Sequence, residues 1–262
     1  MKISIIIPVY NAASTIRRAI ASVDTKQNYE IICINDGSTD ESRTVLEQLQ
    51  KEYPNITLIN QENKGAAASR NKGLAHMTGD VFMFLDADDE FLTSRIDFMA
   101  DFYQKAEDVD IVLGQIAKGK HGEWQPIYTH QEIQKLEKVE LAQCPDIMQS
   151  IGPGGKMFSA QFADLRFDED VVFCEEHFFI ITAYKKAKKI QLLPNIVYGY
   201  NEIEGSVTNQ RAEQFESYML DALKVRTRVM DLLSSKDERT YYSYRMDELI
   251  VSYLLHAYIE KN

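Results

Sequence analysis

The chain has 262 residues, of which 45% are hydrophobic, and its formal net charge is −11 at pH 7. This length suits one large α/β domain or one domain with an appendage, and the composition is ordinary for a packed soluble protein. The acidic balance argues against nonspecific nucleic-acid binding, because that task needs a basic face that displaces counterions. A local site for a single nucleotide is still compatible with this charge.

The first 115 residues alternate between strand and helix patterns. Short runs rich in β-branched residues predict strands at 3–9, 30–35, 56–59, 81–85 and 110–115. Apolar residues at helical spacing predict helices between them, around 16–23, 42–49, 66–76 and 93–106. Such βαβ units place their strands in parallel with right-handed crossovers, so we expect the carboxyl ends of the strands to face one crevice.

The stretch 81–90, VFMFLDADDE, is the most informative of these elements, because five apolar residues lead directly into an acidic cluster. Asp86, Asp88 and Asp89 would lie at the carboxyl end of a buried strand, where ligands collect in open α/β sheets. Crowded carboxylates repel one another unless a cation neutralises them, and oxygen ligands suit Mg²⁺ or Mn²⁺. The alternative is a simple turn that caps the following helix.

The alternation breaks after residue 115. Residues 116–140 are polar and mixed in pattern, which predicts an irregular excursion or a hairpin. The glycines of 152–156 predict a flexible turn, which is not a Walker loop because the glycine spacing is too short. A helix is expected at 175–186 and two short strands at 190–193 and 196–200. Two apolar stripes then predict a C-terminal helical hairpin: Phe215, Met219, Leu223, Met230 and Leu233, followed by Tyr242, Met246, Leu249, Ile250, Tyr253, Leu254 and Ala257.

The cysteines and the hydropathy of the chain indicate the cellular compartment in which it works. Cys33, Cys144 and Cys174 are odd in number and widely spaced, which gives neither a disulfide framework nor a CxxC metal site. The N-terminal apolar run is short and contains Pro8, so we interpret it as a strand and not as a signal peptide. No stretch approaches the ~20 apolar residues that cross a bilayer. We therefore expect a cytoplasmic protein, with at most peripheral contact to the inner face of the membrane.

Four motifs in a fixed order carry a resemblance: SIIIPVYNAASTI, INDGSTDES, NKGAAASRNKGL and FLDADD. Together they resemble the family 2 glycosyltransferases. The match is close over about the first hundred residues. A weaker similarity, in CEEHFF and GSVTN, extends to about residue 209. The resemblance implies a GT-A fold, which is α/β with a Rossmann-like, mostly parallel central sheet flanked by helices, here with a C-terminal helical extension. It also implies sugar transfer from a nucleotide diphosphate sugar, usually UDP-linked, with inversion.

The resemblance assigns donor-binding roles to residues of the first three motifs. The loop after the first strand would line the base pocket through Pro8, Val9, Tyr10 and Asn11. Asp36 would accept the N3–H of uracil, although a turn or helix cap is the alternative. Ala67 or Ala68, together with Arg70, would face the nucleotide. Lys64 would offset phosphate charge or form a surface salt bridge.

The resemblance also assigns roles to the residues of the acidic motif FLDADD. Asp86, with Ala87 beside it, would lie near the ribose and the metal, and Asp88 would be the direct ligand of Mn²⁺ or Mg²⁺. The ion would stabilise the charge that develops on the leaving diphosphate. Asp89 is expected in a supporting or acceptor-side position. Lys156 matches the acceptor-side GK segment of the family.

Two departures from the family pattern affect the expected chemistry. Relatives carry an aspartate as catalytic base in an E-D-x-x-F motif, whereas this chain has Glu176 at that position and Glu175 before it. We expect Glu176 to be the base, with Glu175 or a purely helix-terminal role as alternatives. Many relatives also place His or Arg before the Gly-Ser pair, where this chain has Asn201, Glu202 and Glu204. Ser206 remains as an acceptor-side hydroxyl.

The sequence thus predicts an inverting, metal-dependent glycosyltransferase of hexosyl or N-acetylhexosaminyl type. Its expected role is bacterial cell-surface polysaccharide synthesis on a glycan or lipid-linked acceptor. The alternatives are an inactive or weakly active scaffold of the same fold and a sugar nucleotidyltransferase, although the first loop lacks that class's glycines. We expect a catalytic domain at 1–209, with a nucleotide-sugar half at 1–115 and an acceptor half at 116–209. The hairpin at 210–262 is expected to pack on the core or form a homo-oligomer contact.

Overall fold

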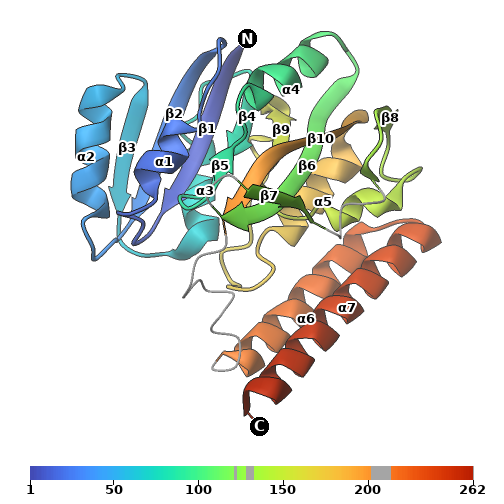
Figure 1. Ribbon diagram of the computed structural model, residues 1–262. Helices are drawn as coiled ribbons and strands as arrows, with labels where there is room; N and C mark the ends of the chain where they lie inside the picture. The colour runs from blue at the N-terminus through green and yellow to red at the C-terminus, as the bar shows by residue number, and fades with distance from the viewer. Residues whose placement is uncertain (121–122, 128–132, 202–213, 262) are drawn as a thin grey trace.

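The computed structural model describes residues 1–120, 123–127, 133–201 and 214–261. The first half contains four strands: β1 (Lys2–Val9), β2 (Asn28–Asp36), β3 (Ile56–Gln61) and β4 (Val81–Phe84). Between them lie α1 (Ile16–Ala21), α2 (Ser42–Glu52) and α3 (Gly65–Leu74). All four strands are parallel, with β1 between β2 and β4 and β3 outside β2. The predicted βαβ alternation is therefore confirmed (Figure 1).

The second half adds β5 (Glu90–Phe91), α4 (Arg95–Gln104), β6 (Val109–Lys120), β7 (Glu123–Pro126), β8 (Glu137–Val139), β9 (Lys156–Ser159), α5 (His177–Lys186) and β10 (Lys189–Asn201). Two short 3-10 helices, Pro145–Gln149 and Ala160–Phe162, flank β9. Over the described residues the strand order is β3-β2-β1-β4-β9-β6-β10-β5, with β7 on β6 and β8 on β10. The predicted parallel pairing holds for β1 to β3, for β4 on β1 and for β10 on β6, whereas β5, β7, β8 and β9 add antiparallel pairs that make the sheet mixed.

Two strands of this half differ from the sequence-based expectation. β9 runs antiparallel between β4 and β6 and was not predicted, because its few residues follow a glycine-rich turn. The two short strands expected at 190–193 and 196–200 are one strand, β10, whose pairing with β6 shifts register between Leu192 and Ile196. The expected hairpin after residue 115 exists as the antiparallel pair β6–β7.

The alternation of side chains along β1 divides the core between the two faces of the sheet. Ile3, Ile5 and Ile7 pack with apolar residues of α1, α2 and α4. Ile6 points to the other face, where the cluster includes residues of α3, α5 and the C-terminal helices. A β-strand exposes successive side chains to opposite faces, so this alternation fixes which helices cover each face.

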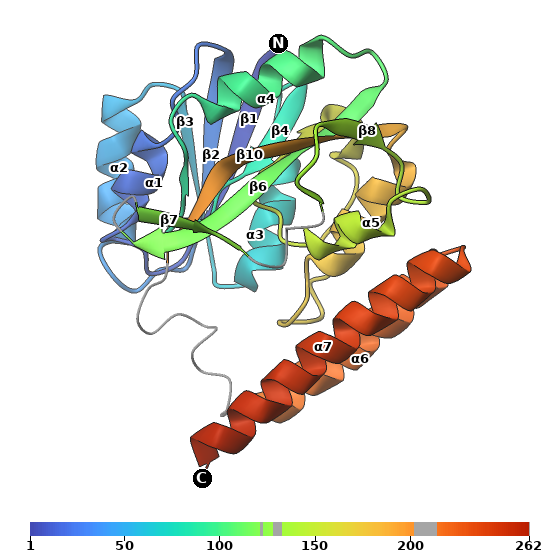
Figure 2. The ribbon, with the colours of Figure 1, turned by 45° about the vertical axis from the view of Figure 1, so that its right-hand side comes forward.

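The C-terminal helices α6 (Phe215–Leu232) and α7 (Lys236–Lys261) form the predicted hairpin. Figures 1 and 2 show them as a long pair lying beside α5, at the end of the molecule away from the N-terminus. The predicted stripe is correct near the end of α6, where Leu233 is buried and Met230 packs against the core. It is misplaced before that point: Leu223 is 52% exposed, and the side chains that pack inward are those of Tyr218, Ala222, Val225 and Val229. Among the described residues, no helix has the length and hydropathy to cross a membrane.

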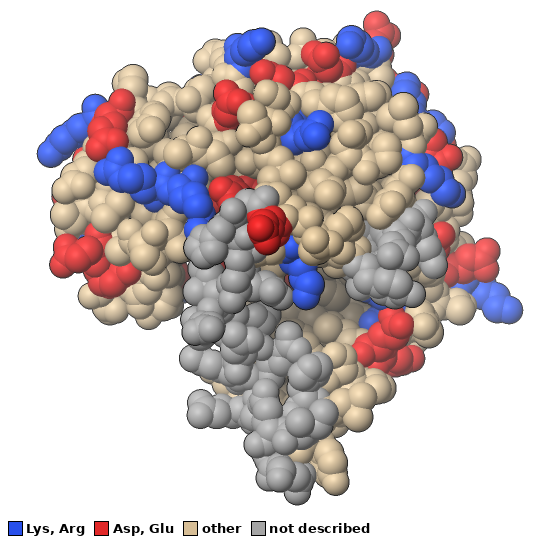
Figure 3. Space-filling model, in the orientation of Figure 1, with Lys and Arg blue, Asp and Glu red and all other residues tan. Residues whose placement is uncertain are grey.

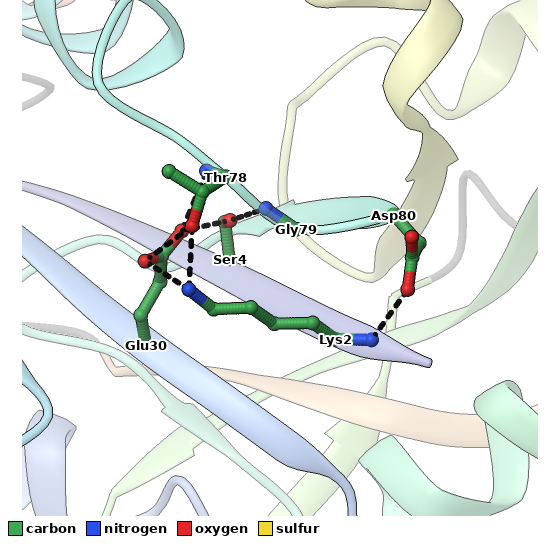
Figure 4. A network of polar contacts seen from close by, with 6 residues as sticks. All are labelled: Lys2, Ser4, Glu30, Thr78, Gly79 and Asp80. Atoms are coloured by element: carbon green, nitrogen blue, oxygen red, sulfur yellow. Dashed lines mark hydrogen bonds and ion pairs between the residues drawn. The ribbon is translucent and has the colours of Figure 1, made fainter.

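A polar network joins the amino-terminal edge of the sheet, opposite the strand ends that carry the motifs (Figure 4). Glu30 accepts hydrogen bonds from the Lys2 ammonium at 2.7 Å, the Ser4 hydroxyl at 2.6 Å and the Thr78 amide at 2.7 Å. The Ser4 hydroxyl in turn accepts the Gly79 amide at 2.9 Å. The network therefore ties the turn before β4 to β1 and β2.

Candidate active site

The motif-bearing loops meet at the carboxyl edge of the sheet, because β1, β2 and β4 are parallel neighbours. Asn11, in the loop after β1, has a left-handed backbone (φ 49°). Its side-chain oxygen accepts the amide of Thr39 at 2.8 Å, which ties the first loop to the loop after β2. Tyr10 beside it is 53% exposed, whereas Val9 is buried. A ligand in this crevice would meet the Tyr10 ring first.

Asp36 lies buried at the end of β2 and caps α3. Its carboxylate accepts the backbone amides of Lys64 at 2.9 Å and Gly65 at 2.8 Å, and the Gln61 side chain at 2.8 Å. The helix-cap alternative therefore describes its contacts in this structure. A carboxylate offers about four acceptor positions, so these three hydrogen bonds leave one acceptor position for a further donor. Reading of uracil by Asp36 stays a prediction.

The acidic loop after β4 is held from several sides. Asp89 is fully buried, and its carboxylate accepts the Tyr198 hydroxyl at 2.9 Å and the Asn201 amide at 2.9 Å. Burial raises the pKa of Asp89 to about 8, and the charges of Asp86 and Asp88 act in the same direction. This burial fits the supporting position expected for Asp89 and leaves no surface for direct acceptor contact.

Three further residues hold the loop backbone that presents Asp88. The Asn201 side chain donates to the Asp88 carbonyl at 3.0 Å, and Arg18 donates to the same oxygen at 2.7 Å. The Tyr198 hydroxyl accepts the Asp86 amide at 3.1 Å. The motifs did not indicate Tyr198 or Arg18, since each lies in a pattern typical of an ordinary strand or helix. Asn201 was noted only as the residue that replaces an expected His or Arg.

Arg70 of α3 connects two acidic segments that are far apart in sequence. Its guanidinium donates to Asp86 at 2.9 Å and to Glu175 at 3.1 Å, and it lies over the Phe167 ring. Burial alone would lower the pKa of Arg70, but the carboxylates of Asp86 and Glu175 raise it above its usual value. Its buried Nε has no hydrogen-bond partner among the described residues. One side chain thus spans the distance between the acidic loop and the start of α5.

Glu175 and Glu176 form the acidic pair at the start of α5. Cys174, just before them, has a left-handed backbone (φ 64°), so the chain turns sharply at this point. Burial raises the pKa of Glu175 to about 8, and Glu176 raises it further, against the effect of Arg70. Glu176 is the N-cap residue of α5, yet its side chain makes no capping hydrogen bond. The two carboxyls therefore differ: Glu175 is paired with Arg70, while Glu176 is not used to cap the helix.

Lys156 lies in the interior, with only 1% of its surface exposed. Its ammonium donates to the Ser150 hydroxyl at 2.8 Å and to the carbonyls of Gly152 and Gly154. Burial lowers the pKa of Lys156 to about 7, and the charge of Glu176 opposes this change. The residue thus holds the glycine turn beneath the acidic pair, and its burial does not fit direct contact with an acceptor. The other acceptor-side residue, Ser206, lies outside the described residues, as do Glu202 and Glu204.

The described part of the chain contains no group of three or more His, Cys, Asp or Glu side chains that could hold a metal ion. The acidic loop does offer the neighbouring carboxylates of Asp86, 35% exposed, and Asp88. Burial raises the pKa of Asp88, and the charge of Asp86 raises it further, so a cation bound here would favour the ionised form of Asp88. Mg²⁺ is commonly bound through one or two carboxylates together with substrate phosphates. The residues therefore fit an ion that is shared with a nucleotide diphosphate.

Comparison with known proteins agrees with this geometry. The sequence pattern of the family described as "Glycosyl transferase family 2" matches residues 4–168. The chain is a family 2 glycosyltransferase. It is 32% identical over 268 residues to the Staphylococcus aureus (strain N315) protein named glycosyltransferase TagX, covering 100% of this chain and 76% of the relative.

A second relative of this glycosyltransferase is the "Poly(ribitol-phosphate) beta-glucosyltransferase" of Bacillus spizizenii, 33% identical over 76% of this chain and 32% of that protein. Among solved structures, S. aureus TarS 1-349 in complex with UDP-GlcNAc superposes with a TM-score of 0.72 at 20% identity. That match covers 97% of this chain and 72% of TarS 1-349. The structural likeness confirms the GT-A fold that the motifs predict.

On the face shown in Figure 3, basic and acidic side chains of the described residues are interspersed.

Proposed function

We propose that this family 2 glycosyltransferase moves a sugar from a UDP-sugar to a hydroxyl of a glycan or lipid-linked acceptor, with inversion. The contact that supports this best is the pair of hydrogen bonds by which Arg70 joins Asp86 at the strand end to Glu175 at the start of α5. This contact supports a donor diphosphate site at Asp86 that adjoins the proposed base beside Glu175. The UDP-GlcNAc complex of the structural neighbour TarS favours a UDP-sugar as donor.

On the donor side, the proposed base pocket lies between the exposed Tyr10 ring and the buried carboxylate of Asp36. The other donor-binding residues proposed from the motifs are Pro8, Val9, Asn11, Ala67, Arg70, Asp86 and Ala87. Asp86 and Asp88 would hold Mn²⁺ or Mg²⁺ together with the donor diphosphate. When bound, such an ion supplies Lewis-acid stabilisation of the leaving diphosphate.

On the acceptor side, we assign the general base to Glu176. Inversion is a single displacement, so one carboxylate must take the proton of the acceptor hydroxyl as that oxygen attacks the anomeric carbon. Glu176 suits this role because no capping hydrogen bond uses its side chain. Glu175 suits a supporting role, because Arg70 already binds it and its raised pKa leaves it mostly protonated at neutral pH.

We propose that the reaction is a step of bacterial cell-surface polysaccharide synthesis. The name of the Bacillus spizizenii relative, a poly(ribitol-phosphate) glucosyltransferase, favours a polyol-phosphate polymer as the class of acceptor. We propose residues 1–209 as the catalytic domain and 210–262 as an appended hairpin, at the cytoplasmic face of the membrane.

The test is a panel of UDP-sugars, with GDP-mannose as a control donor, incubated with and without Mn²⁺ while UDP or GDP release is measured. We expect metal-dependent UDP release from at least one UDP-sugar, and faster release when a poly(ribitol phosphate) acceptor is added. Binding of UDP without release from any donor would contradict the proposal and favour a scaffold of the same fold. Release from GDP-mannose alone would contradict the UDP assignment.

A further inference from the structure

The C-terminal hairpin binds the chain on both sides of the acidic pair Glu175–Glu176. On its amino-terminal side, one carboxylate oxygen of Asp221 on α6 accepts the backbone amides of Val172 at 2.8 Å and Phe173 at 3.2 Å. Nearby, Arg228 of α6 forms ion pairs with Asp168 at 2.9 Å and Asp170 at 2.8 Å. The backbone that leads into Glu175 therefore depends on side chains of α6.

Aromatic rings continue this contact. The Phe173 ring stacks on Tyr218 of α6 with centroids 5.1 Å apart, and it meets Tyr253 of α7 at 4.7 Å. Both tyrosines are buried. The segment before the acidic pair is thus held by both helices of the hairpin at once.

On the carboxyl-terminal side of the pair, His177 is the first residue of α5 and directly follows Glu176. Its Nδ1 lies 3.0 Å from the hydroxyl of Tyr242 on α7, and both side chains are buried. Burial lowers the pKa of His177 to about 4, so the imidazole is neutral and makes a directional hydrogen bond with Tyr242. Between these two attachments, Cys174 holds a left-handed backbone that side chains rarely adopt without support from their surroundings.

We propose that Asp221 and Tyr242 are positioning residues, through which the C-terminal hairpin fixes the direction of the Glu175–Glu176 pair. The hairpin is then part of the catalytic apparatus and not only an appendage or a subunit contact. Neither residue touches substrate; each acts on the backbone or side chain next to the pair. The catalytic consequence rests on the proposed role of Glu176 as base.

The first test asks whether substitutions in the hairpin lower kcat, which depends on the Glu175–Glu176 pair, without changing the Kd for UDP. Tyr242→Phe keeps the ring but removes the bond to His177, and Asp221→Ala removes the acceptor for both amides. Because a small misplacement of a catalytic group can cost ~100-fold in rate, we expect kcat to fall ~10–100-fold in each variant. The Kd for UDP should stay unchanged, since the proposed UDP contacts lie on other loops.

Two matched variants control for loss of stability. Asp221→Asn keeps a side-chain oxygen that can accept both amides, so it should retain most of the activity that Asp221→Ala loses. Asp231→Ala changes an exposed carboxylate on the same helix and should leave kcat unchanged. Equal losses of kcat and of UDP affinity in Tyr242→Phe and Asp221→Ala would overturn the proposal, because the hairpin would then support the whole fold without selectivity for the pair.

A second measurement needs no turnover. Cys174 is buried within this turn, so in a background that carries Cys33→Ala and Cys144→Ser its rate of reaction with a thiol reagent reports opening of the turn. We expect faster labelling in Tyr242→Phe and Asp221→Ala than in Asp231→Ala. Unchanged labelling together with unchanged kcat would overturn the positioning role. Faster labelling with unchanged kcat would instead overturn the assignment of the base to this pair, and the catalytic role of the hairpin with it.

Discussion

Replacing Glu175 by glutamine is expected to stabilise the fold at neutral pH. In the folded protein burial and Glu176 raise the pKa of Glu175 to about 8, against the effect of Arg70, whereas the pKa in an unfolded chain is about 4.3. The folded state therefore keeps a proton that the unfolded state has already lost. The stability that this group contributes is complete below the unfolded pKa and is lost as the pH rises towards the folded pKa.

The size of the effect follows from the difference between the pKa of Glu175 in the folded and in the unfolded chain. Each pH unit between the two pKa values corresponds to about 1.4 kcal/mol, so the rise from pH 5 to pH 7 removes about 3 kcal/mol of wild-type stability through this group. Glutamine is neutral at both pH values and does not lose this contribution. Its side-chain oxygen can also still accept the Arg70 bond, which is 3.1 Å long in the wild type.

The assay is urea unfolding of both proteins at pH 5, 6 and 7, with Glu107→Gln, an exposed carboxylate near β6, as the control. The free energy of unfolding of Glu175→Gln, relative to wild type, should increase by about 3 kcal/mol from pH 5 to pH 7. The control should show no such increase. A constant difference across this range, or a Glu175→Gln variant less stable than wild type at pH 7, would refute the reasoning.

Three further variants test other parts of the molecule. Glu176→Gln should reduce turnover by ~10²–10⁴-fold while the Kd for the donor stays nearly unchanged; if turnover is unaffected, the base lies elsewhere, with Glu175 and then Glu204 next in line. Asp88→Asn should abolish metal-dependent turnover with an intact fold, as judged by circular dichroism, and full activity in metal-free buffer would contradict the metal assignment. Glu30→Gln should lower the free energy of unfolding by about 1 kcal/mol, because glutamine keeps only one of the two oxygens that accept from Lys2, Ser4 and Thr78, while turnover per folded molecule stays the same; an unchanged urea midpoint would contradict this.

The sequence predicted the nucleotide-sugar half well, because its signals are local. The apolar strand of 81–85 that leads into Asp86 is visible as a contiguous pattern, and parallel pairing then places its end beside the ends of β1 and β2. Side-chain alternation along β1 needs no long-range information either. The parallel pairing of these strands and the edge that carries their motifs therefore follow from the sequence.

The acceptor half was harder to predict, because its structure depends on pairing between distant segments. β9 is short and becomes a central strand only because β4 and β6 lie on either side of it. The α6 stripe was misplaced because its inward face includes the small Ala222 and the amphipathic Tyr218, which a search for large apolar residues does not select. The contact between Arg70 and Glu175 likewise joins residues far apart in the chain, and no spacing rule predicts it.

Burial also changed the interpretation of single residues. Lys156 and Asp89 were expected on the acceptor side from their motifs, yet both are in the interior, where they hold the glycine turn and the acidic loop. A charged residue in a functional motif gives no indication of whether it meets the substrate or supports a neighbour. Only the contacts of the folded chain distinguish the two cases.

A crystal structure with UDP and Mn²⁺ would test the proposed donor site most directly. We predict that uracil lies between Tyr10 and Asp36, that Arg70 borders the same crevice, and that the ion joins the diphosphate to Asp86 and Asp88. UDP bound at another edge of the sheet, or an ion held without these carboxylates, would contradict the proposed site.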